Sequence, residues 1–189
     1  MCCLEANAMQ LEKRLVEIMR SNEELIEDLQ LVQQLNLPNW WIAAGYVRNY
    51  VWDYLHGHKE RTKLNDVDVI YYDPTNISIS LEAELEDRLK QKKPAYQWSI
   101  KNQARMHLKN NDLPFVNVED AMKRWPETAT AVGIRLSDEN EFAVIAPHGL
   151  DDLFNLVVRK SEFFADEAYY RQRISSKKWS EHWNKLTFH

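Results

Sequence analysis

The sequence predicts an α+β protein in which a small mixed β-sheet is flanked by helices, with helical segments at both ends. Apolar residues recur at helical spacing in residues 1–36 and 150–189, whereas residues 40–146 contain short apolar runs bounded by turn residues. The 189 residues, 44% of them hydrophobic, are enough to build one sizeable core. Because no repeat, low-complexity tract or linker divides the chain, we expect a single domain over residues 1–189.

The N-terminal part predicts two amphipathic helices. Leu11 and Leu15 lie on the apolar stripe of the first. Ser21 followed by Glu24 has the spacing of a capping box and predicts the start of the second, which should end before Pro38.

The remaining elements follow from the positions of apolar runs and of turn residues. We expect, in order, a strand over 40–44, a helix over 46–55, a strand over 66–72, a helix that follows the turn at 73–76 and is stopped by Pro94, a strand over 96–102, a short helix through 106, a helix over 118–125, strands over 128–136 and 141–146 that form a hairpin, and helices from 150 to the end.

Two aspartates stand where a polar loop becomes the strand over 66–72. In a strand, side chains at i and i+2 project from the same face, roughly 6–7 Å apart, so Asp66 and Asp68 can converge on one cation site. Two carboxylates this close repel each other, and a divalent cation that prefers oxygen ligands relieves the repulsion. The pattern therefore predicts that Asp66 and Asp68 are catalytic residues that bind Mg²⁺ or Mn²⁺.

A glycine lies between the strand over 40–44 and the following helix. Gly45 is expected to let the chain turn tightly into the helix N-terminus, where unpaired N–H groups and the positive end of the helix dipole favour an anion. Arg48 lies in the first turn of the same helix. We therefore expect Gly45 and Arg48 to bind the phosphates of a nucleotide.

The strand over 96–102 supplies a third group of candidates. If it lies beside the strand over 66–72, then Lys101, Asn102 and Arg105 form the far wall of the site. Cations offset the charge of a triphosphate, and an amide can bond ribose hydroxyls or a base edge, so these residues are candidates for nucleotide binding.

These motifs carry a resemblance to a known superfamily. The run Ala44-Gly45-Tyr46-Val47-Arg48-Asn49, followed by Tyr54-Leu55-His56-Gly57, resembles the Gly-Gly-x-Val-Arg-Asp…Leu-Leu-Gly signature of the polymerase-beta nucleotidyltransferases, such as tRNA CCA-adding enzymes and poly(A) polymerases. Segments 98–107, 119–130 and 149–154 more closely resemble a family of small bacterial nucleotidyltransferase-like proteins of unassigned substrate. The resemblance implies a metal-dependent enzyme that moves a nucleoside monophosphate from an NTP to an unknown acceptor (a small molecule, protein or RNA) and releases pyrophosphate.

The chain departs from the superfamily pattern at three points. Ala44 replaces the first glycine of the pair, Asn49 replaces the usual aspartate, and the strand over 96–102 carries no third metal-binding acid. Either Asp66 and Asp68 suffice, or an acid from another segment contributes, or catalysis has been lost; the candidate acids are Glu119, Asp120 and Glu127. The alternative function is thus a catalytically inactive nucleotide- or RNA-binding module that acts through partner contacts.

Charge and hydropathy limit the partners and the cellular location that we expect for the protein. The net charge of −5 argues against a general nucleic-acid coat, although residues 159–185 hold seven bases and four acids, a net +3. In that basic end Trp179, Trp183 and Leu186 are spaced as a helical packing stripe, with Lys177 and its neighbouring lysines expected in solvent. No apolar run approaches the roughly 20 residues that span a bilayer, so we expect a cytoplasmic protein without a membrane partner. The oligomeric state stays open.

Overall fold

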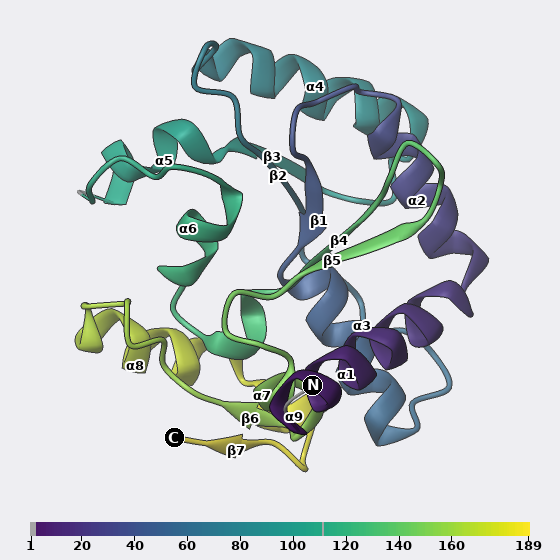
Figure 1. Cartoon of the computed structure of the whole chain (residues 1–189), viewed down its shortest axis with the longest axis vertical. Coiled ribbons are helices and arrows are strands. Elements are labelled where there is room, and N and C mark those ends of the chain that lie inside the picture. The colour runs from purple at the N-terminus through teal and green to yellow at the C-terminus, as the bar shows by residue number, and fades with distance from the viewer. Residues whose placement is uncertain (1–2, 111) are drawn as a thin grey trace.

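The computed structural model describes residues 3–110 and 112–189, and it has helices packed around a central sheet (Figure 1). The first two residues of the expected N-terminal helical part lie outside this description. The helices are α1 (Cys3–Arg20), α2 (Glu23–Gln33), α3 (Gly45–His56), α4 (Ile79–Lys92), α5 (Gln103–Asn110), α6 (Val118–Lys123), α7 (Asp151–Phe154), α8 (Glu167–Lys177) and α9 (Trp179–His182), with a 3₁₀ turn at Thr128–Thr130. The strands are β1 (Trp41–Ala43), β2 (Val67–Tyr71), β3 (Trp98–Asn102), β4 (Gly133–Leu136), β5 (Phe142–Ile145), β6 (Val157–Val158) and β7 (Thr187–Phe188).

Five strands form the main sheet in the order β3-β2-β1-β4-β5. The β2–β3 pair is parallel and the other pairs are antiparallel, so the sheet is mixed, as the sequence predicts. In Figure 1, α5, α6 and α8 lie to the left of the sheet and α2 lies to its right. The predicted α+β class is confirmed.

The two faces of the sheet differ in their cover. Val67 and Val69 belong to the larger apolar cluster, which includes residues of α1, α2, α3 and α4. Ile70 points to the opposite face, where it packs in a smaller cluster with Val118 and Met122 of α6. Asp68 alternates with Val67 and Val69, so it lies on the α6 side, where it is only partly buried.

The connection from β1 to α3 is a single residue, Ala44. Its backbone has φ 55° and ψ −126°, a conformation that glycine adopts freely and that strains a residue with a Cβ. Gly45 has no positive φ and is the first residue of α3. The expectation that Gly45 makes the tight turn is therefore wrong, because the chain reverses one residue earlier.

Replacing Ala44 with glycine should stabilise the protein by about 1 kcal/mol, because release of backbone strain exceeds the entropy that glycine adds to the unfolded chain. The matched control is Ala43→Gly in the buried strand β1, which should destabilise the protein since that backbone is regular. Urea unfolding of both variants measures the difference. A less stable Ala44→Gly variant would show that Ala44 is not strained.

The C-terminal segment is anchored by tryptophans. Trp52 of α3 packs edge-on against Trp179 and Trp183, with ring centroids 5.6 and 5.2 Å apart. Trp183 also donates a hydrogen bond from Nε1 to the buried Asp53 at 2.8 Å. The predicted packing of Trp179, Trp183 and Leu186 is confirmed, since all three are buried, but the helix expected to carry them ends at His182, so Trp183 and Leu186 pack from the chain that follows α9.

Three local expectations are wrong. The cap of α2 is Asn22, whose side chain accepts from the Glu24 amide, whereas the Ser21 hydroxyl donates to the Ile18 carbonyl. Residues 128–130 form a 3₁₀ turn, so the strand expected over 128–136 begins only at 133. The segment from 150 onward contains, besides its helices, the paired short strands β6 and β7.

Candidate functional site

The two aspartates lie where three strands meet the start of α3. Asp66 immediately precedes β2, and Asp68 is its second residue. The register pairs Asp68 with Ala43 of β1 on one side and with Ser99 of β3 on the other. Because β1 ends at Ala43, the first turn of α3 begins directly beside the aspartate pair.

The surroundings of Asp68 favour a cation. Burial and the neighbouring Asp66 raise the pKa of Asp68 to about 6, while the Ser99 hydroxyl and the positive charges of Arg48 and Lys177 act in the opposite direction. The aspartate pair therefore carries a repulsion that a bound cation would relieve.

Arg48 is buried next to this pair. Its Nη1 donates to the Thr130 hydroxyl at 2.7 Å, and its Nη2 donates to Asn49 Oδ1 at 2.8 Å. The guanidinium carbon lies 4.4 Å from the ring centroid of Trp179, and burial lowers the pKa of Arg48 to about 10. Arg48 is thus a cation held in a fixed position in the wall of the site. An arginine on the exposed face of a helix would not be held in this way.

Two hollows flank the aspartates. The first, which we call the Arg48 pocket, has a volume of about 120 Å³ and is lined by Gly45, Arg48 and Asp66, by the loop before β2, and by α8 and α9 residues that include Lys177 and His182. The second, the Trp125 pocket, has a volume of about 240 Å³ and lies on the Asp68 side. Its lining includes Trp125, Phe115, Met106, Tyr169 and Gln103.

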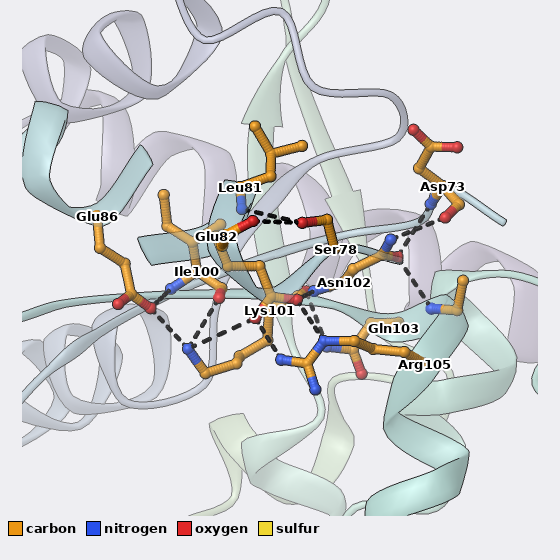
Figure 2. Close-up of polar contacts among 12 residues, drawn as sticks. Asp73, Ser78, Leu81, Glu82, Glu86, Ile100, Lys101, Asn102, Gln103 and Arg105 are labelled. Carbon is orange, nitrogen blue, oxygen red and sulfur yellow. Dashed lines mark hydrogen bonds and ion pairs between the residues drawn. The ribbon is translucent and has the colours of Figure 1, made fainter. Parts of the chain in front are cut away.

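The three residues proposed for the far wall have strong partners of their own (Figure 2). Asn102 is fully buried and makes four hydrogen bonds through its amide, to the backbone of Asp73, Asn76 and Ala104. Lys101 Nζ donates to Glu86 at 2.6 Å, and Arg105 is paired with the buried Glu82 through two nitrogens.

These contacts hold together α4, β3 and the start of α5. Lys101 also lines the Trp125 pocket together with Asp68, whereas Asn102 and Arg105 are not among the residues that line it. A direct contact of Lys101, Asn102 or Arg105 with nucleotide stays a prediction.

The acids considered as a third metal ligand are engaged elsewhere. Glu127 is fully buried and accepts from Arg173 Nε at 2.6 Å. Glu119 pairs with Lys123, and Asp120 accepts from the Val116 amide. Among residues 3–110 and 112–189, no group of three or more His, Cys, Asp or Glu side chains is placed to hold a metal.

Several residues that line the site have no sequence signal that marks them. Lys63 precedes β2 by a few residues, whereas Lys177 and His182 come from the C-terminal helices more than one hundred positions away. Ser99 could have been suggested by the predicted strand pairing, because it lies opposite Asp68 once β2 and β3 are aligned.

Comparison with known proteins assigns the family. A nucleotidyltransferase family profile matches residues 30–188. The chain belongs to this nucleotidyltransferase family. A solved NMR structure described as revealing a CCA-adding enzyme head domain is 35% identical, with a TM-score of 0.83, over 94% of this chain and 95% of that one. The suspected relationship to the polymerase-beta nucleotidyltransferases is therefore confirmed.

Larger tRNA-processing enzymes share the fold of this nucleotidyltransferase. A CCA-adding enzyme in complex with CTP is 15% identical with a TM-score of 0.59, and the Thermotoga maritima CCA-adding enzyme in complex with tRNA is 15% identical with a TM-score of 0.57. They cover 95% and 94% of this chain, which in turn spans 43% and 42% of those enzymes. No curated protein matches the chain.

In the part of the chain that the structure describes, no helix is long and apolar enough to cross a bilayer.

Proposed function

We propose that this protein is a metal-dependent nucleotidyltransferase that moves a nucleoside monophosphate from an NTP to an acceptor and releases pyrophosphate. The observation that carries the proposal is the placement of Asp66 and Asp68 beside the first turn of α3 and the buried Arg48. The family and the CTP complex of a structural relative support it.

The donor set suits a cation that is shared with phosphates. Mg²⁺ is commonly bound through one or two carboxylates, with the remaining ligands supplied by water and substrate phosphate oxygens. Asp66 and Asp68 would hold Mg²⁺ or Mn²⁺ in this way. When bound, the metal would neutralise the charge that develops on the phosphates during transfer.

The residues of the chain would bind and orient the nucleotide. The first turn of α3 has no side-chain cap, and because the Val47 amide already donates to the Ala44 carbonyl, the amides that would bind phosphate oxygens are those of Gly45 and Tyr46. Arg48, held by Thr130 and Trp179, supplies a fixed positive charge beside them. Such preorganised groups stabilise developing charge without reorganising during the reaction.

The proposed reaction is a displacement at the α-phosphorus of the NTP. The acceptor oxygen forms a bond to the α-phosphorus, and the bond from that phosphorus to the bridging oxygen of the β-phosphate breaks. The electron pair leaves with pyrophosphate, and the acceptor proton passes to water. The Trp125 pocket, lined by flat aromatic rings and the Gln103 amide, would hold the nucleoside or the acceptor.

A second candidate function is a binding module that keeps the nucleotide site without turnover. It is favoured by the absence of a third acid beside Asp66 and Asp68 among the described residues. The two functions differ in one observable, because only the enzyme releases pyrophosphate.

Nucleotide binding should depend on divalent metal. We expect at least one NTP to bind at least about tenfold more tightly with Mg²⁺ than with EDTA, since the bare carboxylates repel the triphosphate. Asp68→Asn should abolish this difference without loss of stability, because it removes a like-charge pair. The control is Asp73→Asn. Asp73 lies beyond the other end of β2, and its side chain accepts a hydrogen bond from the Thr75 amide within its own turn. Calorimetry showing equal wild-type affinity in Mg²⁺ and in EDTA would contradict the proposed site.

A further inference from the structure

The Trp125 pocket and the Arg48 pocket lie on different sides of the aspartate pair. Asp68 lines the first and Asp66 lines the second, and the two hollows share no described lining residue. In a displacement at phosphorus, the attacking oxygen approaches in line with the leaving oxygen and from the opposite side. If pyrophosphate leaves on the side of the Arg48 pocket, the acceptor oxygen therefore arrives from the Trp125 pocket.

The cations that border the Trp125 pocket are already paired. Lys101 Nζ donates to Glu86 at 2.6 Å. Arg173 Nε donates at 2.6 Å to Glu127, which is fully buried. The rest of the lining is mostly apolar and includes aromatic rings. Such a pocket favours a neutral aromatic ring with a hydroxyl over an anionic acceptor, because no unpaired cation is present to offset an added negative charge.

The wall of this pocket itself contains a ring of that kind. Among the described residues that line it, Thr130 and Tyr169 carry hydroxyls. Thr130 is 3% exposed, and its oxygen accepts a hydrogen bond from Arg48 Nη1 at 2.7 Å. Tyr169 is 48% exposed. The hydroxyl of this wall that a bound substrate can reach is therefore that of Tyr169.

Helix α8 presents Tyr169 to the pocket. The helix lies on the same side of the sheet as α5 and α6 (Figure 1). Tyr169 and Arg173 are one turn apart on α8, and both line the pocket. Tyr170 points elsewhere, since it is buried and its hydroxyl donates to the His189 carbonyl at 3.3 Å. The buried Tyr170 and the ion pair of Arg173 thus hold α8 in the orientation that turns Tyr169 toward Asp68.

The phenol of Tyr169 lies beside a positive charge. Burial acts to lower the pKa of Arg173, but Glu127 and then Tyr169 raise this pKa above its ordinary value, which places the guanidinium next to the phenol. A neighbouring cation stabilises a phenolic oxygen as it loses its proton. The surroundings of Tyr169 therefore favour attack by its oxygen on a phosphorus.

We propose that Tyr169 is a site of self-modification, which accepts a nucleoside monophosphate from the NTP bound in the same chain. Tyr169 Oη forms a bond to the α-phosphorus, and the bond from that phosphorus to the bridging oxygen of the β-phosphate breaks. The electron pair leaves with pyrophosphate, and the phenolic proton passes to water. This self-modification rests on the proposed function, to which it adds a phenol as the chemical class of the acceptor.

The test is incubation of the purified whole chain with Mg²⁺ and each of the four NTPs in separate samples, without cell extract, followed by mass spectrometry of the protein and its peptides. With one NTP, wild type should gain one nucleoside monophosphate, located on Tyr169. Tyr169→Phe removes only an exposed hydroxyl, so the variant should fold like wild type and gain no nucleotide. The matched control is Tyr54→Phe on α3, a residue that is 56% exposed and lines neither hollow, and this variant should be modified like wild type.

Dilution tests whether the donor site and the acceptor belong to one chain. At saturating NTP, the modified fraction after a fixed time should change less than about twofold over a roughly hundredfold dilution of the protein, since an intramolecular step does not depend on protein concentration. A modified fraction that falls in proportion to the protein concentration would overturn the assignment to the same chain.

The outcomes separate the self-modification from the proposed function. Transfer to an acceptor in a cell extract without any label on Tyr169 would overturn the self-modification and leave the proposed function intact. Equal modification of wild type and Tyr169→Phe would also overturn it, because another residue would then be the acceptor. A label on Tyr169 would support it even if no component of the extract is labelled. Absence of transfer both to the protein and to the extract would overturn both.

Discussion

Asp66→Ala is expected to lower the rate of pyrophosphate release from the preferred NTP by about a thousandfold or more. Asp66 stands beside β2 and borders the pocket that holds Arg48 and Lys177, so its loss would leave the transferring phosphate without a correctly placed cation. Because Asp66 is exposed, the variant should keep the wild-type melting temperature. The measurement is the initial rate of pyrophosphate release with a cell extract as the source of acceptor.

The control for this prediction is Asp73→Asn, which removes an acid near the opposite end of the same strand. Asp73 accepts hydrogen bonds from Thr75 and does not line either hollow of the site. The rate of pyrophosphate release by the Asp73→Asn variant should stay close to that of wild type. If Asp66→Ala retained a rate within tenfold of wild type, the aspartate pair would not be the catalytic centre.

Asp53→Ala should cause the second large effect, a loss of about 3 kcal/mol in the free energy of unfolding. The buried Asp53 carboxylate accepts from the Thr62 amide at 2.7 Å, the Thr62 hydroxyl at 2.6 Å and Trp183 Nε1 at 2.8 Å. It therefore joins α3 to the loop before β2 and to Trp183, the residue that follows α9. Truncation leaves these donors buried without an acceptor, which costs more than the loss of one exposed contact.

Urea unfolding compares this variant with two others. Asp53→Asn keeps a side-chain oxygen and should lose less stability, and Asp87→Ala on the exposed side of α4 should lose almost none. A loss of stability below about 1 kcal/mol would show that Asp53 does not anchor the C-terminal segment.

Local pattern predicted the elements well where one periodicity dominated. The alternation of Val67 and Val69 with Asp68 places the aspartate on the opposite face from the larger core, as the structure shows. The Trp179 and Trp183 stripe was likewise recognised as packing. Local pattern failed at Ala44, because a Gly-containing signature suggests glycine as the turning residue although the strained conformation belongs to the alanine before it.

The partners of polar side chains could not be predicted from sequence. Arg105 and Lys101 were assigned to the nucleotide wall, and the structure pairs them with Glu82 and Glu86 of α4, which lie 23 and 15 residues earlier in the chain. The sequence predicted that Lys177 is solvated beside the Trp179 stripe, and the structure confirms that this last residue of α8 is exposed. The docking of Trp179 on Trp52 brings it to the pocket that Arg48 also lines, and no local spacing encodes that proximity.

Transfer of the α-phosphate is the measurement that tests the central claim most directly. Wild-type protein is incubated with Mg²⁺, a cell extract and each of the four NTPs, labelled in parallel samples at the α- or the γ-phosphate. With one NTP, the α-label should move to an acceptor and the γ-label should appear in pyrophosphate, and both signals should be absent with Asp66→Ala. Bound nucleotide whose α-label stays in the NTP under every condition would contradict nucleotidyl transfer and leave the nucleotide-binding module as the function of this fold.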